Sequence, residues 1–323
     1  MAEMGSGYSA ALSGSAFFVL PDGGFLRISG DDRAAFLQRQ SSNDVRRLAP
    51  GRTVLTVLTT PMARILDVLC LLDEGQSLGA LTLPGQSAAT YQFLRSRIFF
   101  MDKVTVEQAS AGLVQIELFG PQAAGAAAGL GVDRLPGPGE WAELQFGGAR
   151  LRLIGQEREF GPGWLLLVPA EVQSPVVQAL EAAGARAVSA EERQVLRVEA
   201  GLPSAGAELT EAYTPFEAGL AAAVSDAKGC YTGQEILARQ VTYDKVVQQL
   251  RALKLEAMLD PGVRLLAEDG QPAGVVTSAV HSPRFGPIAL AVLRRPSDQP
   301  GVHLHAGTPQ GPLAIVSLPG SWS

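Results

Sequence analysis

The interpretation of this 323-residue chain depends on one short stretch, KGCYTGQE at residues 228–235. Its two glycines allow a tight backbone and the close approach of a ligand or partner. Lys228 lies two residues before Cys230, and a nearby lysine favours the thiolate, the form of cysteine that acts as nucleophile and metal ligand. Residues 234–239 have helical character, so Cys230 also stands just ahead of the positive end of a helix dipole. The stretch is therefore a candidate to present a cysteine for chemistry or ligation.

The alternative for Cys230 is a purely structural role, because most free cysteines are buried and behave as small hydrophobic residues. Local chemistry alone favours that alternative over a functional thiol. Cys70 lies inside the apolar run 66–72 and is interpreted as a core residue. Two cysteines so far apart do not form a disulfide framework, which indicates a reducing, cytoplasmic compartment.

Two carboxylates lie upstream of this stretch. SAEE at residues 189–192 is a capping-box pattern, and it predicts a helix that carries Glu199 near its end. Glu217 lies in the segment TPFEAGL. Solvated surface glutamates are the common case, whereas a pocket carboxylate could make a bidentate pair with an aminopyrimidine edge such as that of a pterin. Spacing alone does not separate these alternatives.

The chain changes character at about Lys245. Beyond it, short strands and turns predict a small all-β unit of roughly 70–75 residues, within the usual size of a domain. Before it, strands and helices are mixed. Residues 17–20 and 25–28 flank the turn PDGG and predict a hairpin, Asp31 is predicted to cap a helix over 33–40, and residues 86–100 are predicted to be helical. GxGxxG and long βαβ spacing are absent from the sequence, which disfavours a doubly wound nucleotide fold.

Composition excludes several classes of protein. Hydrophobic residues make up 46% and charged residues 18%, as in an ordered globular protein. The net charge is -6 and no basic stripe stands out, so we expect no direct nucleic-acid binding. The apolar runs are too short to span a membrane, and no membrane partner is expected. The three histidines lack metal-ligand spacing, so no metal site is predicted.

Several segments together resemble the YgfZ family, folate-binding relatives of the glycine-cleavage T-protein (aminomethyltransferase). KGCYTGQE is the most specific of them. The others are RVEAGLP at 197–203, TPFEAGL at 214–220, residues 30–38, 42–45 and 60–67, and GVVTS at 274–278. The resemblance touches almost the whole chain.

The resemblance implies an α+β fold, a T-protein-like ring of two mixed α/β subdomains and a small C-terminal β-barrel around a central folate-binding hole. The expected domains are an N-terminal folate-binding subdomain over 1–115, completed by 190–245, a second α+β subdomain over 116–190, and the barrel over 246–323.

The resemblance also implies a tetrahydrofolate-binding accessory factor for the assembly or maintenance of iron–sulfur proteins, acting indirectly on tRNA modification. Its expected partners are folate and iron–sulfur assembly proteins or client enzymes. Cys230 would be the functional thiol, either as a ligand to a cluster shared with a partner or as a nucleophile, with Lys228 favouring its thiolate. The residues expected at the folate are Glu199 at the pterin, Arg239 at the carboxylate tail, and Tyr231, Gly233 and Gln234.

The main alternative is a tetrahydrofolate-dependent aminomethyltransferase or another one-carbon transferase. That branch typically has a phenylalanine in place of the cysteine in the segment that matches 228–235. The acid that it uses near its folate would fall around Ala89-Thr90 here, and the sequence has no carboxylate between Glu74 and Asp102. This argues against aminomethyl transfer. A third possibility is a scaffold that has lost folate.

Overall fold

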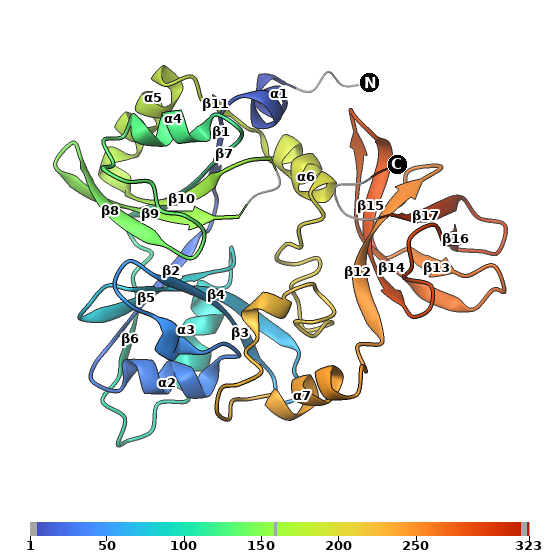
Figure 1. Cartoon of the computed structure of the whole chain (residues 1–323), viewed down its shortest axis with the longest axis horizontal. Helices are drawn as coiled ribbons and strands as arrows, with labels where there is room; N and C mark the ends of the chain where they lie inside the picture. The colour runs from blue at the N-terminus through green and yellow to red at the C-terminus, as the bar shows by residue number, and fades with distance from the viewer. Residues whose placement is uncertain (1–4, 158–159, 318–321, 323) are drawn as a thin grey trace. The chain divides into compact units, whose positions relative to one another are not determined.

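The computed structural model describes residues 5–157, 160–317 and 322. The chain divides into two compact units, coloured along the sequence in Figure 1. The first unit comprises Met1–Thr59, Leu66–Glu192 and Ala222–Thr232. The second comprises Thr60–Ile65, Arg193–Ala221 and Gly233–Ser323. Each unit is therefore assembled from segments that are far apart in the sequence.

The first unit contains a five-stranded sheet in the order β3-β4-β5-β2-β6. Its strands are β2 (Gly24–Ser29), β3 (Thr53–Thr59), β4 (Ile65–Asp73), β5 (Ser77–Thr82) and β6 (Thr105–Gln108). Helices α2 (Arg33–Gln40) and α3 (Ser87–Arg95) bury Phe36, Leu37 and Leu94 in a core with Leu26 and Ile28 of β2. A short 3-10 helix, Val45–Arg47, follows α2.

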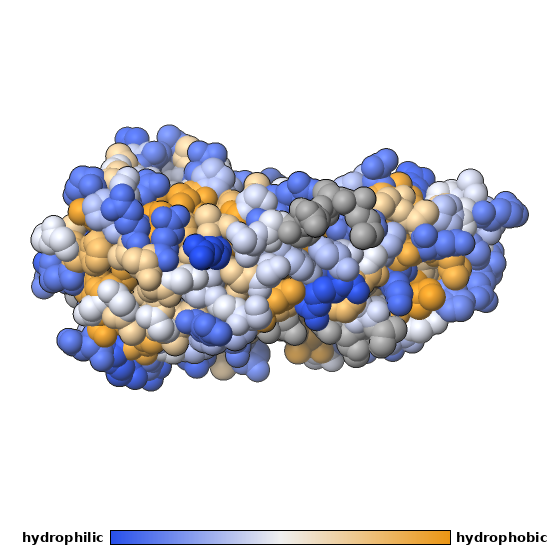
Figure 2. Space-filling view, turned by 90° about the horizontal axis from the view of Figure 1, so that it is seen from above, coloured by the Kyte–Doolittle hydropathy of each residue, from blue (hydrophilic) through white to orange (hydrophobic). Residues whose placement is uncertain are grey.

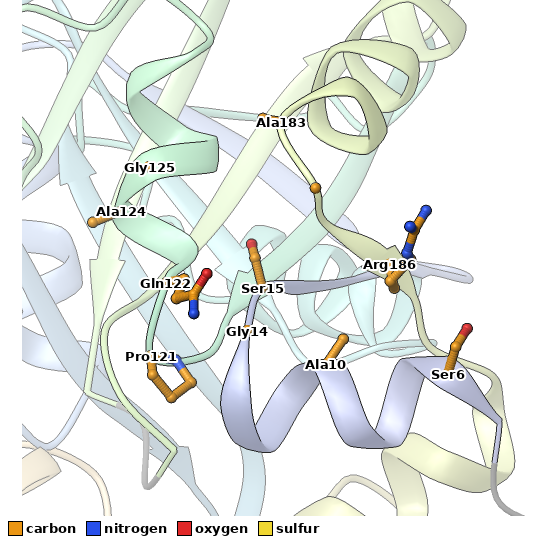
Figure 3. Close-up of a pocket in the computed structure, with 11 residues that line it drawn as sticks. Ser6, Ala10, Gly14, Ser15, Pro121, Gln122, Ala124, Gly125, Ala183 and Arg186 are labelled. Atoms are coloured by element: carbon orange, nitrogen blue, oxygen red, sulfur yellow. The ribbon is translucent and has the colours of Figure 1, made fainter.

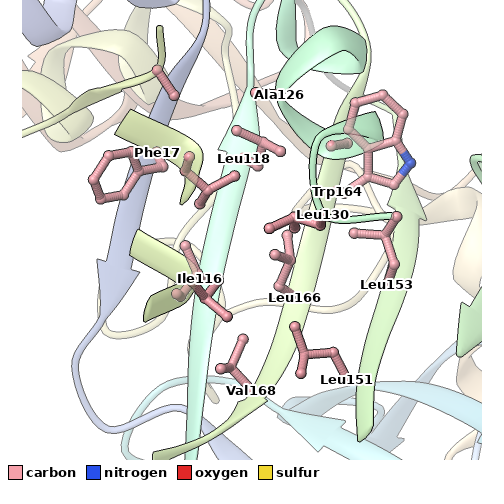
Figure 4. Packing of buried hydrophobic residues seen from close by; sticks show 14 of the residues in the cluster. Phe17, Ile116, Leu118, Ala126, Leu130, Leu151, Leu153, Trp164, Leu166 and Val168 are labelled. Atoms are coloured by element: carbon pink, nitrogen blue, oxygen red, sulfur yellow. The ribbon is translucent and has the colours of Figure 1, made fainter. Parts of the chain in front are cut away.

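A six-stranded sheet in the same unit has the order β11-β1-β7-β10-β9-β8. Its strands are β1 (Ala16–Leu20), β7 (Leu113–Phe119), β8 (Trp141–Phe146), β9 (Ala149–Gln156), β10 (Gly163–Pro169) and β11 (Arg186–Ala187). Helices α4 (Ala123–Ala128) and α5 (Gln173–Ala182) pack onto it, and Figure 4 shows the core that they close around Ile116, Leu118 and Leu166. Helix α1 (Ser6–Ser13) precedes β1, and a 3-10 helix, Ala170–Val172, precedes α5.

The two sheets of the first unit share a third apolar cluster. Phe25, Leu72 and Leu81 come from the five-stranded sheet, and Ile154, Leu165 and Leu167 from the six-stranded sheet. Successive side chains of a strand point to opposite faces, so Trp164, Leu166 and Val168 of β10 face the helices while Leu165 and Leu167 face the other sheet. Burial on both faces explains why this strand is an unbroken apolar run.

The second unit is dominated by a closed barrel in the order β12-β15-β14-β13-β16-β17. Its strands are β12 (Gln248–Leu255), β13 (Arg264–Leu266), β14 (Pro272–Ser282), β15 (Gly286–Arg294), β16 (His303–Ala306) and β17 (Leu313–Ser317). Closure leaves no edge strand, and Leu253, Leu265 and Leu293 fill the interior. The predicted C-terminal β-barrel is confirmed, whereas its bounds at 246 and 323 stay a prediction. Helices α6 (Ala190–Glu199) and α7 (Gln234–Thr242) and the 3-10 helix Ala221–Ala223 complete the described elements.

Several local predictions can be compared with these elements. The capping box is confirmed: the backbone N–H of Glu192 donates to Ser189 Oγ, and Ser189 N–H donates to the Glu192 carboxylate. The predicted hairpin is wrong, because β1 pairs with β7 and β11 whereas β2 pairs with β5 and β6. A turn signal fixes a bend in the chain but not which strands pair across it.

The helix predicted over 33–40 is confirmed as α2, whereas the end of a second helix and the N-cap of α2 were predicted wrongly. The helix expected over 86–100 is α3, which ends at Arg95. The N-cap residue of α2 is Asp32 rather than Asp31, and its side chain does not cap the helix. The Asp32 carboxylate instead accepts the backbone N–H of Lys103 at 2.9 Å. A long-range donor has therefore replaced the local one that the sequence suggested.

The surface and the helices agree with the composition. On the face drawn in Figure 2, hydrophilic and hydrophobic residues are intermixed. No helix in the described part of the chain is long and apolar enough to cross a membrane.

Candidate functional site

Lys228 is a buried cation that joins two distant segments of the first unit. Its side chain is 5% exposed. Its Nζ donates to three backbone carbonyls, at 2.7 Å to Gln38, 2.5 Å to Ser41 and 2.9 Å to Asn43. We call these contacts the Lys228 clamp. Residues 228–230 are thereby fixed to the end of α2.

The position of the clamp follows from helix chemistry. The last carbonyls of a helix have no partner within it, and α2 ends at Gln40. A cation near this end satisfies a carbonyl and interacts favourably with the negative end of the helix dipole. Burial lowers the pKa of Lys228 to about 8, although the nearby Asp44 acts in the opposite direction.

The rest of segment 222–232 is held by further hydrogen bonds within the unit. Ser42 Oγ donates to the carbonyl of Ala223 at 2.6 Å, and Ser42 O accepts the N–H of Ser225. At the other end, Thr59 Oγ1 donates to the carbonyl of Thr232 at 2.6 Å. The segment is therefore fastened on both sides of Cys230.

Cys230 itself is exposed, which the sequence could not establish. Next to it, the ring of Tyr231 is buried, and its centroid lies 4.9 Å from Lys228 Nζ. Burial raises the pKa of Tyr231 to about 12, so the phenol stays protonated at physiological pH. Cys70 is half-buried against an apolar cluster, and burial raises the pKa of its thiol to about 11. Cys230 is therefore exposed although Lys228 and Tyr231 close to it are buried.

The predicted role of Lys228 toward the thiolate stays a prediction. The N–H groups of the ammonium are directed at carbonyls, and what the clamp supplies is a fixed backbone around Cys230. The structure thus brings Lys228, Cys230 and Tyr231 together in the first unit.

Four other predicted residues lie in the second unit, which the chain enters after Thr232. Gly233 has a positive φ of 83° and stands at the N-terminus of α7. Gln234 and Arg239 are on that helix, and Arg239 is exposed. An exposed guanidinium is suited to a carboxylate ligand. The folate roles of these residues remain predictions.

Glu199, the fourth of these residues, ends α6 with its carboxylate turned toward the barrel. The side chain is 1% exposed, Ser282 Oγ donates to its Oε1 at 2.6 Å, and Arg284 Nη1 lies 3.5 Å from its Oε2. Glu217 is also buried, and it accepts the N–H of Thr214 and pairs with Arg64. The solvated alternative for both glutamates is therefore wrong. The contact of Glu199 with a pterin stays a prediction.

A second buried ionic group lies two residues earlier in α6. Arg197 Nη1 is 3.4 Å from Glu208 Oε2, and its Nη2 donates to Ser278 Oγ at 2.7 Å. Ser278 in turn donates to Glu208 Oε1 at 2.6 Å. Glu208 is fully buried, and burial lowers the pKa of Arg197. These contacts fasten α6 to β14 within the second unit.

Asp67 is a buried carboxylate in the first unit that the sequence reasoning did not single out as a site residue. It accepts Thr90 Oγ1 at 2.5 Å and the N–H groups of Val68 and Leu83 at 2.8 and 3.0 Å. Burial raises its pKa to about 6. The sequence has no acid near Ala89-Thr90, but the fold brings Asp67 of β4 to Thr90 of α3. The available signal was a single acid within the apolar strand ILDVLCLL.

A separate hollow of about 700 Å³ opens beside α1, the start of α4 and the end of α5 (Figure 3). Its lining residues do not include the predicted site residues. Small side chains such as Ala10 and Ala124 line it, together with Ser15 and Arg186. Among the described residues, no group of three or more His, Cys, Asp and Glu side chains is arranged to hold a metal ion.

Comparison with known sequences identifies relatives over most of the chain. The model of the GCVT N-terminal domain matches residues 22–228. A chloroplastic protein of Arabidopsis thaliana, provisionally named a transferase, is 31% identical over 79% of this chain, which spans 59% of that protein's length. An aminomethyltransferase of Saccharopolyspora erythraea is 28% identical, with 97% of this chain and 88% of the relative covered.

A solved structure has the same fold. The glycine cleavage system aminomethyltransferase T from Bartonella henselae superposes with a TM-score of 0.86, covering 98% of this chain and 88% of its own, at 22% identity. The predicted fold class, with mixed α/β subdomains and a closed six-stranded C-terminal barrel, is therefore confirmed. The ring with its central hole and the division at residues 115 and 190 stay predictions.

Proposed function

Because the chain belongs to the GCVT N-terminal domain family, we propose that it binds tetrahydrofolate and acts as a one-carbon transferase. The observation that carries this proposal is the end-to-end similarity to proteins named aminomethyltransferases, over 97% of the chain in one case. The specific role in iron–sulfur protein assembly, which the YgfZ resemblance implies, is the second candidate.

Asp67 supports the transferase proposal, because it supplies the acid whose apparent absence argued against it. A carboxyl group with a pKa of about 6 can exchange a proton near neutral pH. Thr90 Oγ1 donates to it and the N–H groups of Val68 and Leu83 fix its orientation. In this proposal the strand β4 holds the proton-exchanging group and Thr90 positions it.

The folate, when bound, would carry the one-carbon unit on its nitrogen atoms. The residues assigned to it fit the group in part. The exposed Arg239 suits a carboxylate tail. Glu199 has its carboxylate engaged by Ser282 and Arg284. A carboxylate has about four acceptor positions, so a further donor is compatible with these contacts.

The decisive experiment incubates the protein with an aminomethylated carrier protein and tetrahydrofolate and measures methylene-tetrahydrofolate. We expect product from the wild type, loss of most activity in Asp67→Asn, and near-normal activity in the matched control Asp73→Asn on the same strand. Folate binding, measured separately by calorimetry, is expected to survive in all three proteins. Folate binding without product formation by the wild type would reject the transferase proposal.

The second candidate, a folate-binding accessory factor for iron–sulfur proteins, is favoured by the exposure of Cys230 on a segment fastened on both sides. It predicts that Cys230→Ser keeps normal folding and folate binding but abolishes the cellular activity of iron–sulfur enzymes. Cys70→Ala provides the control for the loss of a thiol. Normal cellular activity in Cys230→Ser would remove this candidate.

The two candidates are separable in a single preparation. The transferase proposal expects Cys230→Ser to form methylene-tetrahydrofolate at the wild-type rate, because Cys230 has no part in it. The accessory proposal expects no product from either protein. Absence of folate binding at millimolar ligand would instead favour the scaffold alternative.

A further inference from the structure

Three consecutive large apolar side chains stand in solvent on one loop of the first unit. The exposed fraction is 67% for Phe99, 98% for Phe100 and 74% for Met101. The loop joins α3 to β6. We call these three residues the apolar tip. Contiguous exposed apolar groups mark surfaces that meet another apolar phase.

The tip is held open by its own turn. The N–H of Asp102 donates to Phe99 O at 2.9 Å, and the Asp102 carboxylate accepts the N–H of Phe99 at 3.0 Å. Arg39 Nη2 donates to the other oxygen of that carboxylate at 2.8 Å. The backbone is thus braced from both ends, and the three side chains are directed outward without a further ordering cost on contact.

The base of the tip is rich in cations. Arg95, Arg97 and Lys103 flank it in sequence, and Arg39 lies beside it through Asp102. Two nearby acids are engaged in backbone contacts: Asp102 accepts from Phe99 and Asp32 from Lys103.

One further acid, Asp31, is exposed, and it lies 3.6 Å from Lys103 Nζ. The whole chain has a net charge of -6. At physiological ionic strength, however, screening limits electrostatic attraction to a distance of about 8 Å. A surface in contact with the apolar tip therefore interacts electrostatically mainly with the cations around the tip.

We propose that the apolar tip inserts into the headgroup region of an anionic lipid bilayer, with the surrounding arginines and Lys103 against the lipid phosphates. The tip presents on the order of 450 Å² of apolar surface, from the size of its side chains. A stable dimer needs about 800 Å² on each partner, whereas a bilayer needs no matching surface. Aromatic tips with basic neighbours suit the lipid interface.

This proposal is independent of the function proposed above. It differs from the expectation of no membrane partner, which rested on the absence of sequence runs long enough to span a bilayer. A peripheral tip needs no such run.

The test is co-sedimentation of the full chain with vesicles of phosphatidylcholine and phosphatidylglycerol, compared with vesicles of phosphatidylcholine alone. We expect binding to the anionic vesicles, weakened by added salt. Phe100→Ser is expected to lower the partition coefficient roughly tenfold, as the loss of one inserted aromatic side chain implies. Met62→Ser removes another exposed apolar group, 65% exposed and outside the tip, and is the control.

Two further measurements sharpen the result. Phe100→Trp should show a blue-shifted fluorescence increment when anionic vesicles are added. Arg95→Gln should weaken vesicle binding with only a small change in the melting temperature, since it removes the cation without placing an anion at the end of α3. The proposal is overturned if the wild type does not bind anionic vesicles, or if Phe100→Ser binds them as the wild type does. A dimer in light scattering that Phe100→Ser dissolves would overturn it in favour of a contact between copies.

Discussion

The most deeply buried charges have different kinds of partner in the two units. In the first unit, Lys228 is held by three backbone carbonyls and Asp67 by two N–H groups and a hydroxyl, all neutral. In the second unit, Arg197 meets Glu208 and Arg284 meets Glu199, so that charge lies against charge. Neutral partners offset the cost of burial only in part, which is why the pKa values of Lys228 and Asp67 move toward neutrality. The first unit is therefore expected to respond to pH where the ion pairs do not.

The largest expected effect comes from breaking a pair in the second unit. Glu208→Gln leaves the buried Arg197 charged and without its anion, and should lower the free energy of unfolding by about 3–5 kcal/mol. Urea unfolding measures the loss. The exposed neighbour Glu211 supplies the control, since Glu211→Gln should change stability by less than about 0.5 kcal/mol. Equal effects would mean that the pair contributes nothing.

A smaller effect is expected in the first unit. Lys228→Met keeps the side-chain length but leaves three buried carbonyls without their donor, at a cost of about 2 kcal/mol. The same urea titration measures it, with Lys245→Met as an exposed control. A changed rate of Cys230 labelling by a thiol reagent in Lys228→Met, but not in Lys245→Met, would show that the clamp fixes the backbone around the thiol. Unchanged stability and labelling would contradict the clamp.

The pH dependence of stability separates the two kinds of buried charge. The pKa of Lys228 is about 8 in the folded chain against 10.5 for a free lysine. Between these values the unfolded chain binds more protons, so stability should rise with pH, by at most about 1.4 kcal/mol per pH unit. The rise in the free energy of unfolding between pH 8 and 10, measured by urea titration, should be present in the wild type and absent in Lys228→Met. Its persistence in that variant would assign it to another group.

Asp67 should give the smallest effect, a dependence of stability on pH that has the opposite sign to that of Lys228. Its pKa is about 6 in the folded chain against 3.8 for a free aspartate, so the folded chain binds more protons between pH 4 and 6. Stability should therefore fall as pH rises through this window. Asp67→Asn should flatten the slope in thermal unfolding, whereas Asp73→Asn should retain it. A flat wild-type profile would show that Asp67 is ionised throughout.

Much of the fold was within reach of the sequence. The barrel follows from short apolar runs between turns, and the capping box at Ser189 is a contact between residues three apart. The predicted hairpin failed because pairing of β1 with β7 joins residues about a hundred positions apart, which a local pattern does not encode. The end of α3 was missed because the apolar residues after Arg95 continue a helical pattern that the structure instead exposes.

The site was predicted less completely, and for the same reason. The exposure of Cys230 depends on packing around it. The Glu199 carboxylate is bonded by Ser282 and Arg284, which lie more than eighty residues away in the sequence. Asp67 was invisible as a neighbour of Thr90 because only the sheet brings them together. The sequence indicated which residue types could take part in a site, but it did not indicate the long-range contacts that decide their chemistry.

The Lys228 clamp also has a consequence for synthesis on the ribosome. Lys228 lies 190 residues after Gln38, whose carbonyl it caps. At roughly 5–20 residues per second, α2 emerges some 10–40 seconds before the ammonium that caps it. Through that interval the carbonyls of Gln38, Ser41 and Asn43 face water or a chaperone. The nascent first unit therefore lacks these contacts until segment 222–232 has emerged. Only then is the backbone on both sides of Cys230 held in place.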